Sequence, residues 1–473
     1  MPEPTAPHEL RLSAGVSVLA AFVLLAYIAW ITWTQASVPP LDRVSSPEQA
    51  LLLMVSRAMD LEEALAQAPR WERRLYEVTT GGIDEPAQAI AWYEELAAYS
   101  SDPLAHFHLA ILEAEAGRLD RIRLRTDGWE HRPEPFPTFL RVIRAGYLGS
   151  HLDHDGALLL QRELAELVPT GWFYDRLTMR LATQSGNHAL LAATREGLAA
   201  RAGLLLGRYR LLAAIDLAWL LAGILALFAV FTRHGRDLKV GTPPIPPRWR
   251  ARVAVAVLLR GGAIAAVLTI SADFIRVESP LLRLVVTPVI NLPLLILAYR
   301  HLLAPSGLGF RQGLGLWPAA ADWHRLGVIV PVVLAAALVG EWVIGLAAGS
   351  VDLSSHWTEG FDEELVWGSM PVLAVSFIDD VVFAPVFEEI VFRGLLFATL
   401  RRKFGWRTSA AASAVVFALA HEYGVLELAS VFWSGILWAW AYEKTGSLLP
   451  GMVAHAVNNL VVFVSVIVLL RLA

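Results

Sequence analysis

The chain contains no cysteine among its 473 residues. That absence excludes disulfide bonds, thiolate nucleophiles and metal sites with cysteine ligands, and it gives no information about the redox compartment. Charge is also scarce, because Asp, Glu, Lys and Arg make up only 18% of the residues, against about 25% in a soluble domain. The net charge of −5 gives no indication of nucleic-acid binding. Since 56% of the residues are hydrophobic, the composition indicates a membrane protein with a soluble part.

Nine apolar runs are candidates for membrane-spanning helices, each of which needs about 20 residues to cross a bilayer. The first, residues 13–33, is longer than the core of about 7–15 residues in a signal peptide, so it predicts an uncleaved anchor. We expect an all-α fold, a polytopic transmembrane helical bundle of about nine spans, in which the run at 408–422 is short for a span. The other runs cover residues 209–231, 252–274, 280–299, 326–348, 371–400, 425–442 and 448–470.

The charges of the loops predict the orientation, because Lys and Arg in short loops mark the cytoplasmic side. The loops at residues 232–252 and 400–407 are rich in Lys and Arg, and an even number of expected spans separates them. The loop at 351–370 carries acidic residues and neither Lys nor Arg. We therefore expect an integral protein of a bacterial or archaeal inner membrane. Its N-terminus would be cytoplasmic and residues 36–208 extracytoplasmic.

Four segments are predicted: a membrane anchor at residues 1–35, an extracytoplasmic helical domain at 36–208, a second span with a basic loop at 209–249, and a multi-span domain at 250–473. Within the second segment, "PLAHFHLAILEAEAGRL" resembles the first helix of a tetratricopeptide repeat. One interpretation of this domain is a repeat module that binds a peptide or protein partner. The other is an ordinary helical bundle packed on the membrane part.

Three charged side chains lie close together in the apolar run 371–400, where an unpaired charge is costly. Glu389 and Arg393 are four residues apart, so on a regular helix they share a face and can form an ion pair. Glu388 lies about 100° around the same helix and has no such partner. We expect Glu389 to hold the arginine and Glu388 to face a cavity, where a carboxylate suits general-base chemistry on water.

Two later runs also carry polar side chains at helical spacing. Phe417 and His421 are four residues apart, as are His455 and Asn459, so each pair shares a helix face. At about 1.5 Å per residue, Glu388 and His421 lie about 19 Å and about 21 Å from the same basic loop, so they can meet inside the membrane. Singly, each residue can be structural, since a buried histidine often bonds to a carbonyl group. Together, on separate spans, they favour a site.

These residues form three motifs, EExxxR (Glu388, Glu389, Arg393), FxxxH (Phe417, His421) and HxxxN (His455, Asn459). In kind, order and placement on separate spans, they resemble the motifs of the CAAX-protease and bacteriocin-processing (CPBP) family. This family of intramembrane proteases contains the Ras-converting CAAX endopeptidases. The resemblance covers about residues 371–470, and the CPBP-type protease domain that it implies extends back to residue 250, as 250–473; the region at 36–208 is outside it.

The resemblance implies an endopeptidase in which Glu388 and His421 activate the water that attacks a peptide carbonyl. His455 and Asn459 would stabilise the oxyanion, which gains most from prearranged donors in a dry site. Arg393 would brace the second glutamate of its motif. The structural support of the site would come from Glu389, Arg393 and Phe417.

Members of this family have been described both as glutamate-type and as metal-dependent enzymes. The sequence "HEYGV" is not HExxH, because Val425 stands in place of the second histidine, so we expect no cofactor. If the enzyme is a metalloendopeptidase, zinc would bind Glu388, His421 and His455, with a position open for water.

Two other functions compete with a protease. One is a catalytically silent membrane scaffold or immunity-type protein that binds a partner through residues 36–208; the intact motifs disfavour it. The other is a transporter that uses the membrane carboxylate and histidines as a proton or metal relay. A transporter commonly shows internal repeats, and no convincing repeat is present. The expected substrate of the protease is a membrane-associated protein or peptide, or a C-terminal tail, beside the lipid bilayer.

Overall fold

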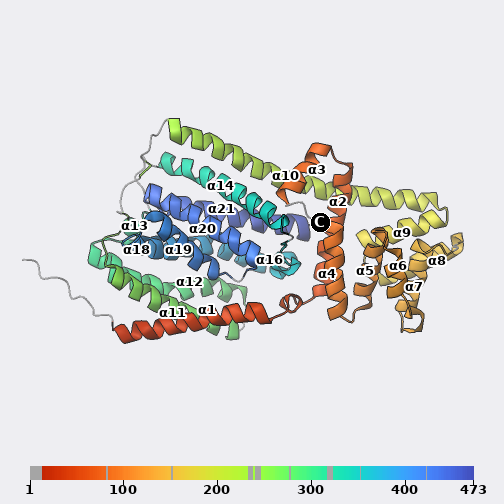
Figure 1. The fold of residues 1–473 in the computed structure, drawn as a ribbon, viewed down its shortest axis with the longest axis horizontal. Coiled ribbons are helices and arrows are strands. Elements are labelled where there is room, and N and C mark those ends of the chain that lie inside the picture. The colour runs from red at the N-terminus through yellow and green to blue at the C-terminus, as the bar shows by residue number, and fades with distance from the viewer. Residues whose placement is uncertain are drawn as a thin grey trace, which may run out of the picture. The chain divides into compact units, whose positions relative to one another are not determined.

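The computed structural model describes residues 13–80, 84–150, 153–232, 238–239, 245, 247–275, 279–316, 323–351, 353–421 and 423–472. Within these ranges every regular element is a helix, which confirms the predicted all-α class. The chain divides into two compact units (Figure 1). Unit 1 comprises Met1–Val38, Ala214–Ser355 and Asp362–Val466, and unit 2 comprises Pro39–Ala213, His356–Phe361 and Ile467–Ala473.

Some residues that support the predicted topology lie outside the described ranges. They are residues 1–12 of the anchor segment, Arg233 and Arg236 of a basic loop, Asp352 of the acidic loop, and Glu422 at the end of the short run. The orientation of the termini and the division into four segments stay predictions.

Eight helices of the described ranges are long and apolar enough to cross a membrane, which confirms a polytopic bundle. They satisfy their backbone groups internally, as a helix in lipid must. The helix α10 begins in unit 2 and ends in unit 1. The eight are α1 (Ala14–Ser37), α10 (His188–Thr232), α11 (Ala251–Ile275), α12 (Pro280–Ala298), α14 (Trp323–Gly349), the composite helix Met370–Leu400, α20 (Val425–Thr445) and α21 (Leu449–Val466).

The expected ninth span, at 408–422, differs from its prediction. The structure contains there α19 (Trp406–Leu419), a helix of 14 residues. At about 1.5 Å per residue it is roughly 21 Å long, short of the about 30 Å of a hydrocarbon core. Because α19 packs against α20, the two form a hairpin whose turn contains His421. The apolar composition that suggested a span therefore belongs to a short helix inside the bundle.

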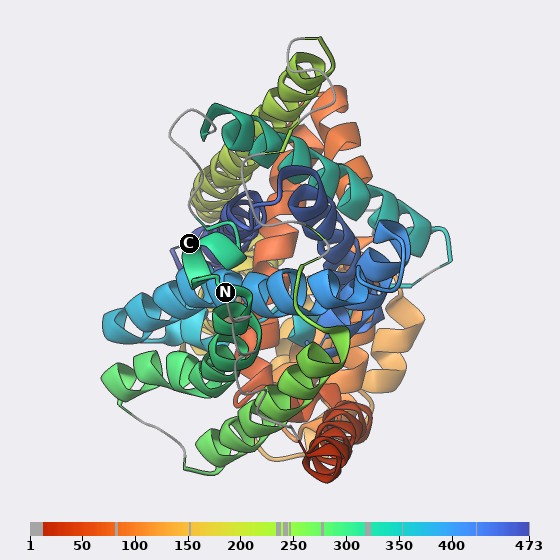
Figure 2. The same ribbon diagram turned by 90° about the vertical axis from the view of Figure 1, so that its left-hand side faces the viewer.

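Unit 1 is a stack of packed helices with the C-terminal elements in its interior. Helix α1 packs on α11, and α11 packs on α12. On the other side α14 packs on α20 and α21. Figures 1 and 2 show α19, α20 and α21 between α14 and the pair α11 and α12. Side chains of these interior helices are therefore held by neighbours on both sides.

The composite helix Met370–Leu400 is not a regular α-helix. It contains α16 (Met370–Phe377), the π-helix η7 (Ile378–Phe383), α17 (Ala384–Glu388), the π-helix η8 (Glu389–Phe397) and α18 (Ala398–Leu400). A π-turn is wider than an α-turn and frequently occurs at functional sites. The regular winding expected from the sequence is therefore interrupted twice, and the glutamate pair stands at the junction of α17 and the second π-helix, η8.

Unit 2 is built from short helices that begin at conventional signals. The carboxylate of Asp84 accepts a hydrogen bond from the Ala87 amide at 3.1 Å, and that of Asp102 accepts one from Leu104 at 3.0 Å. In both cases a proline follows in the first turn, where its missing N–H costs nothing. The helices are α2 (Pro47–Gln67), α3 (Arg70–Thr79), α4 (Glu85–Tyr99), α5 (Pro103–Glu115), α6 (Leu119–Arg125), α7 (Phe136–Tyr147), α8 (His154–Leu167) and α9 (Trp172–Gln184).

Aromatic stacking fills the interior of unit 2. Phe107 of α5 stacks on Phe139 of α7 with ring centroids 3.9 Å apart, and His108 stacks on Phe173 of α9 at 4.2 Å. Successive helices pack on one another, α4 on α5, α5 on α7 and α7 on α9. The described residues between 36 and 208 form helices, as expected for an all-α fold; the predicted domain bounds and the relation to tetratricopeptide repeats stay predictions.

Candidate active site

Two adjacent glutamates lie where α17 meets η8, and their surroundings differ. Glu389 is fully buried and its Oε1 lies 2.9 Å from a guanidinium nitrogen of Arg393, which is also fully buried. The side chain of Glu388 is 28% exposed within the protein, against 1% for Glu389. The predicted ion pair is therefore present, and Glu388 is outside it.

Aromatic rings enclose the guanidinium group of Arg393. Its central carbon lies 4.1 Å from the ring centre of Phe417 and 5.1 Å from that of Trp438. A cation over an aromatic face is stabilised by the negative face of the ring, and more so away from water. Gly435 leaves the space for this arrangement, since a Cβ there would lie 3.2 Å from the arginine. Phe417 thus supports the charged pair directly.

Glu388 faces the histidines of two later elements. Its Oε2 lies 3.7 Å from Nε2 of His455 and 4.0 Å from Nε2 of His421. That oxygen is buried and has no hydrogen-bond partner within the described ranges. Both distances are too long for a direct hydrogen bond, but a single water can bond to two groups at such a separation. The geometry brings together the three groups that the sequence placed on separate helices.

A backbone hydrogen bond orients His421. Its Nδ1 lies 2.8 Å from the carbonyl oxygen of Phe417, one turn earlier in α19. A carbonyl oxygen only accepts, so Nδ1 carries the proton and donates. In the neutral ring Nε2 is then an acceptor, directed at Glu388. The ring also meets Phe417 edge to face at 4.7 Å, which holds its plane.

His455 is held by Trp438 and by both glutamates. Its ring stacks on the indole of Trp438 with centroids 4.1 Å apart and planes 15° apart. Its Nδ1 lies 3.4 Å from Oε1 of Glu389, on the side opposite to the atom that faces Glu388. Glu389 therefore neutralises Arg393 and also lies next to His455, without a hydrogen bond between them.

Asn459 is placed one helical turn beyond His455 on α21. Its side-chain nitrogen donates a hydrogen bond of 2.8 Å to the carbonyl oxygen of Asp380, in the π-helix η7. A primary amide carries two N–H groups, so this contact uses one and leaves the other. No contact joins Asn459 to Glu388 within the described ranges, so it lies beside the cluster of charged groups.

Several residues that build this site are not evident from the three motifs. Trp438 covers both the arginine and a histidine, and Ser413 donates a hydrogen bond of 2.8 Å to the Phe392 carbonyl inside η8. Gly451 permits close approach, since a Cβ there would lie 2.9 Å from Oε2 of Glu389. The only sequence signals for them are tryptophan inside an apolar run and small residues on neighbouring helices.

The predicted zinc ligands can be tested against this geometry. A carboxylate and two imidazoles form a donor set that zinc accepts. Within the described ranges, however, no group of three His, Asp or Glu side chains has the spacing that holds a metal ion. Glu388, His421 and His455 are not such a group as placed, and the zinc site stays a prediction.

Comparison with known families agrees with the motifs. Residues 370–461 match a family model described as Rce1-like, type II CAAX prenyl endopeptidase Rce1-like. The match contains all three motifs, so it confirms the resemblance to CAAX-type intramembrane proteases for this part of the chain. No curated protein and no solved structure matches the chain.

Proposed function

We propose that this chain, whose residues 370–461 are Rce1-like, is an intramembrane endopeptidase with Glu388 as its general base. The observation that carries the proposal is the convergence of two imidazole Nε2 atoms on a buried carboxylate oxygen that has no hydrogen-bond partner among the described residues. Glu389 is neutralised by Arg393 at 2.9 Å, whereas no Arg or Lys pairs with Glu388 among the described residues. A carboxylate that faces two histidines and no arginine is suited to hold a reacting water.

Proton transfer begins with a water held between Glu388 and His421. The carboxylate takes one proton of the water, and the oxygen forms a bond to the carbonyl carbon of the substrate. The electron pair of the carbonyl bond moves to its oxygen. His421 orients the water through Nε2, because its Nδ1 is occupied by the Phe417 carbonyl.

The resulting oxyanion needs donors that are in place before it forms. Nε2 of His455 faces the same oxygen of Glu388 that holds the water, and an Nε2–H there donates to the oxyanion. Asn459 donates to it through the side-chain N–H that the Asp380 carbonyl does not use. Collapse of the intermediate breaks the carbon–nitrogen bond. The proton on Glu388 then passes to the leaving amine and restores the carboxylate.

Arg393 and Glu389 are positioning residues in this mechanism. They touch neither the water nor the substrate, and they set the direction of Glu388 and His455 through the junction of α17 and η8. The substrate is a membrane-associated protein or peptide, as the membrane helices and the family imply. We also propose an inner membrane of a bacterium or archaeon as its place, with a cytoplasmic N-terminus.

The experiment compares two glutamates that both lie in membrane helices. Membranes containing the wild-type chain, Glu388→Gln or Glu341→Gln are incubated, and new peptide N-termini are identified by mass spectrometry. Glu341 lies in α14, outside the site. We expect the same new N-termini from wild type and Glu341→Gln, and none from Glu388→Gln.

Two results would contradict the proposal. Identical products from Glu388→Gln would remove the general base from the mechanism. The absence of products from all three membranes would favour a catalytically silent scaffold that only binds a partner.

A further inference from the structure

A pocket of about 360 Å³ lies within unit 2, between α2, α9 and α10. Its volume is in the range of ligand-binding pockets. One wall is a single face of α9, which carries Arg176, Met179, Arg180 and Thr183 at spacings of three and four residues. The facing wall is a face of α10, and Glu63 of α2 closes the end. Two helix faces therefore direct their side chains into one space.

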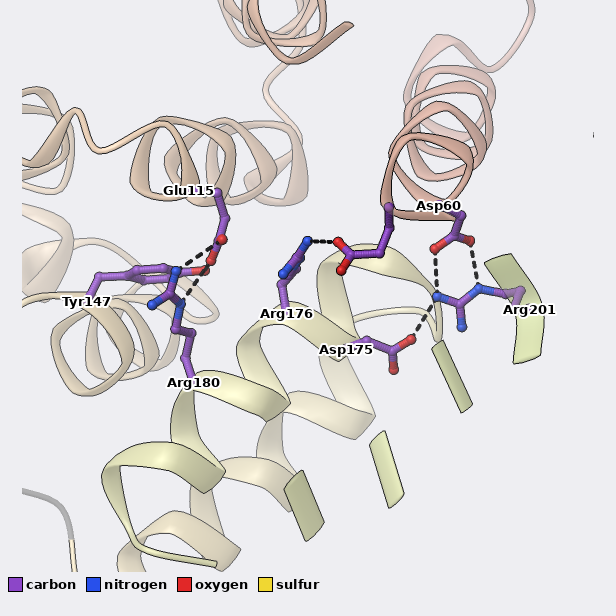
Figure 3. Close-up of polar contacts among 8 residues, drawn as sticks. Asp60, Glu115, Tyr147, Asp175, Arg176, Arg180 and Arg201 are labelled. Carbon is purple, nitrogen blue, oxygen red and sulfur yellow. Dashed lines mark hydrogen bonds and ion pairs between the residues drawn. The ribbon is translucent and has the colours of Figure 1, made fainter. Parts of the chain in front are cut away.

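Three arginines line this pocket, and their hydrogen-bonding capacity is only partly used. Arg180 donates through two nitrogens to Glu115, at 3.0 Å and 3.1 Å (Figure 3). Arg176 pairs with Glu63. Nε of Arg176 is buried without an acceptor in the described part of the chain. Arg195 of α10 is exposed and has no ion pair among the described residues. Since a guanidinium has five N–H groups, many donors remain.

A fourth arginine nearby shows what a structural arginine looks like in this unit. Arg201 binds Asp60 through two nitrogens, at 2.7 Å and 2.9 Å, and lies 2.8 Å from Asp175 (Figure 3). Two carboxylates therefore surround the single guanidinium group of Arg201. In the pocket, three guanidinium groups share only two carboxylates, so its arginines have fewer anionic partners than Arg201 has.

The remaining lining specifies the kind of anion. Three arginines and one glutamate give the lining a net charge of +2, and Met179, Leu191 and Leu198 add apolar surface. Glu63 and the hydroxyl of Thr183 are acceptors, and each suits an amide N–H. A peptide end supplies all three complements: a carboxylate, an apolar side chain and N–H groups. A phosphate carries no apolar side chain and no amide N–H, so it would leave the apolar lining and the acceptors without a complement.

We propose that this pocket binds the C-terminal carboxylate of a peptide whose last side chain is apolar. Arg195 and Arg176 bind the carboxylate, and the leucines and methionine contact the last side chain. Arg180 stays on Glu115 and flanks the site. This binding site lies in unit 2 and does not depend on peptide hydrolysis, so it stands apart from the protease assignment.

The test measures binding of a fluorescein-labelled hexapeptide ending in valine and leucine to the purified full-length chain in detergent. All proteins carry Glu388→Gln, so that cleavage cannot remove the probe. We expect Arg195→Ala and Arg176→Gln each to weaken binding by roughly tenfold, as for loss of a charge-assisted hydrogen bond. The control Arg118→Ala removes an exposed arginine outside the pocket and should leave binding unchanged. Circular dichroism and the unfolding temperature show that each variant is folded.

Two further probes decide the chemistry. The same peptide with an amidated C-terminus should bind at least about tenfold more weakly than the free acid. Inorganic phosphate should compete no better than acetate. Equal binding of the amide, stronger competition by phosphate, or an equal loss in Arg118→Ala would each overturn the proposal. A catalytically inert wild type would leave these results unchanged, which separates them from the proposed function.

Discussion

The same change at two neighbouring residues, Glu388→Gln and Glu389→Gln, should have opposite consequences. Both substitutions keep the size of the side chain and remove one negative charge. Glu389 is the counter-ion of Arg393, and both are fully buried. Glu388 pairs with no Arg or Lys in the described ranges, and its side chain is 28% exposed. The contrast therefore tests whether the two glutamates divide support and chemistry.

The magnitudes follow from burial and pairing. Breaking a buried ion pair leaves an uncompensated charge and costs about 3–5 kcal/mol, so Glu389→Gln should lose that much free energy of unfolding. Glu388→Gln removes no direct hydrogen bond and should change it by less than about 1 kcal/mol. Its rate of peptide cleavage should fall by about 10²–10⁴-fold or more, because a general base is lost.

The assay uses purified protein in detergent micelles. Unfolding is followed by circular dichroism while the fraction of denaturing detergent rises, and cleavage of a membrane substrate is measured on the same samples. An equal loss of stability in both variants would show that Glu388 is a structural residue. Cleavage by Glu388→Gln at the wild-type rate would refute its role in the reaction.

Three further predictions concern other parts of the molecule. Trp438→Ala should lower the free energy of unfolding by about 3–5 kcal/mol and reduce cleavage, because the indole stacks on His455 at 4.1 Å and is 3% exposed; Trp438→Phe should restore part of both. Treatment of the purified enzyme with a chelator should leave the rate of cleavage unchanged, because the proposed reaction uses no metal; a loss of cleavage that zinc reverses would contradict this expectation. Burial lowers the pKa of His108 in unit 2 to about 3, whereas an unfolded histidine titrates near pH 6.5. Between these two pKa values the unfolded chain binds one more proton than the folded chain. The free energy of unfolding should therefore be highest above pH 6.5 and fall by up to about 1.4 kcal/mol per pH unit as the pH drops towards 3. His108→Phe should flatten that decline in urea unfolding followed by circular dichroism, and a steep decline that persists in this variant would contradict the assignment. The exposed-site control His131→Ala should retain the decline.

Local spacing was enough to predict the pairing of Glu389 with Arg393. Residues four apart on a helix are neighbours whatever the rest of the chain does, and the ion pair of 2.9 Å follows from that rule. The same spacing linked Phe417 to His421 and His455 to Asn459. Gly394 lets a neighbouring helix pack closely, since a Cβ there would lie 2.9 Å from Leu314.

Hydropathy predicted the membrane-spanning helices well, except that the run at 408–422 is too short to be a full span. An apolar run shows that a helix avoids water, and it does not show whether lipid or protein surrounds it. Helix α19 is short and packs on α20, so its apolar residues meet the bundle rather than define a full span. The widened turns η7 and η8 were also missed, because π-turns depend on contacts from neighbouring helices. Two such contacts are the bonds from Ser413 and Asn459 to backbone carbonyls.

The sequence by itself determined the all-α membrane class, the three motifs and the pairing of Glu389 with Arg393. These depend on composition and on short-range helical geometry, both of which are local. The tertiary structure decided that Oε2 of Glu388 meets Nε2 of His421 and His455, because those atoms come from three elements whose approach depends on packing. It also decided that Trp438 covers the site and that an arginine-lined pocket exists in unit 2. Contacts between helices distant in the chain depend on crossing angles and close-packed side chains, which no spacing rule contains.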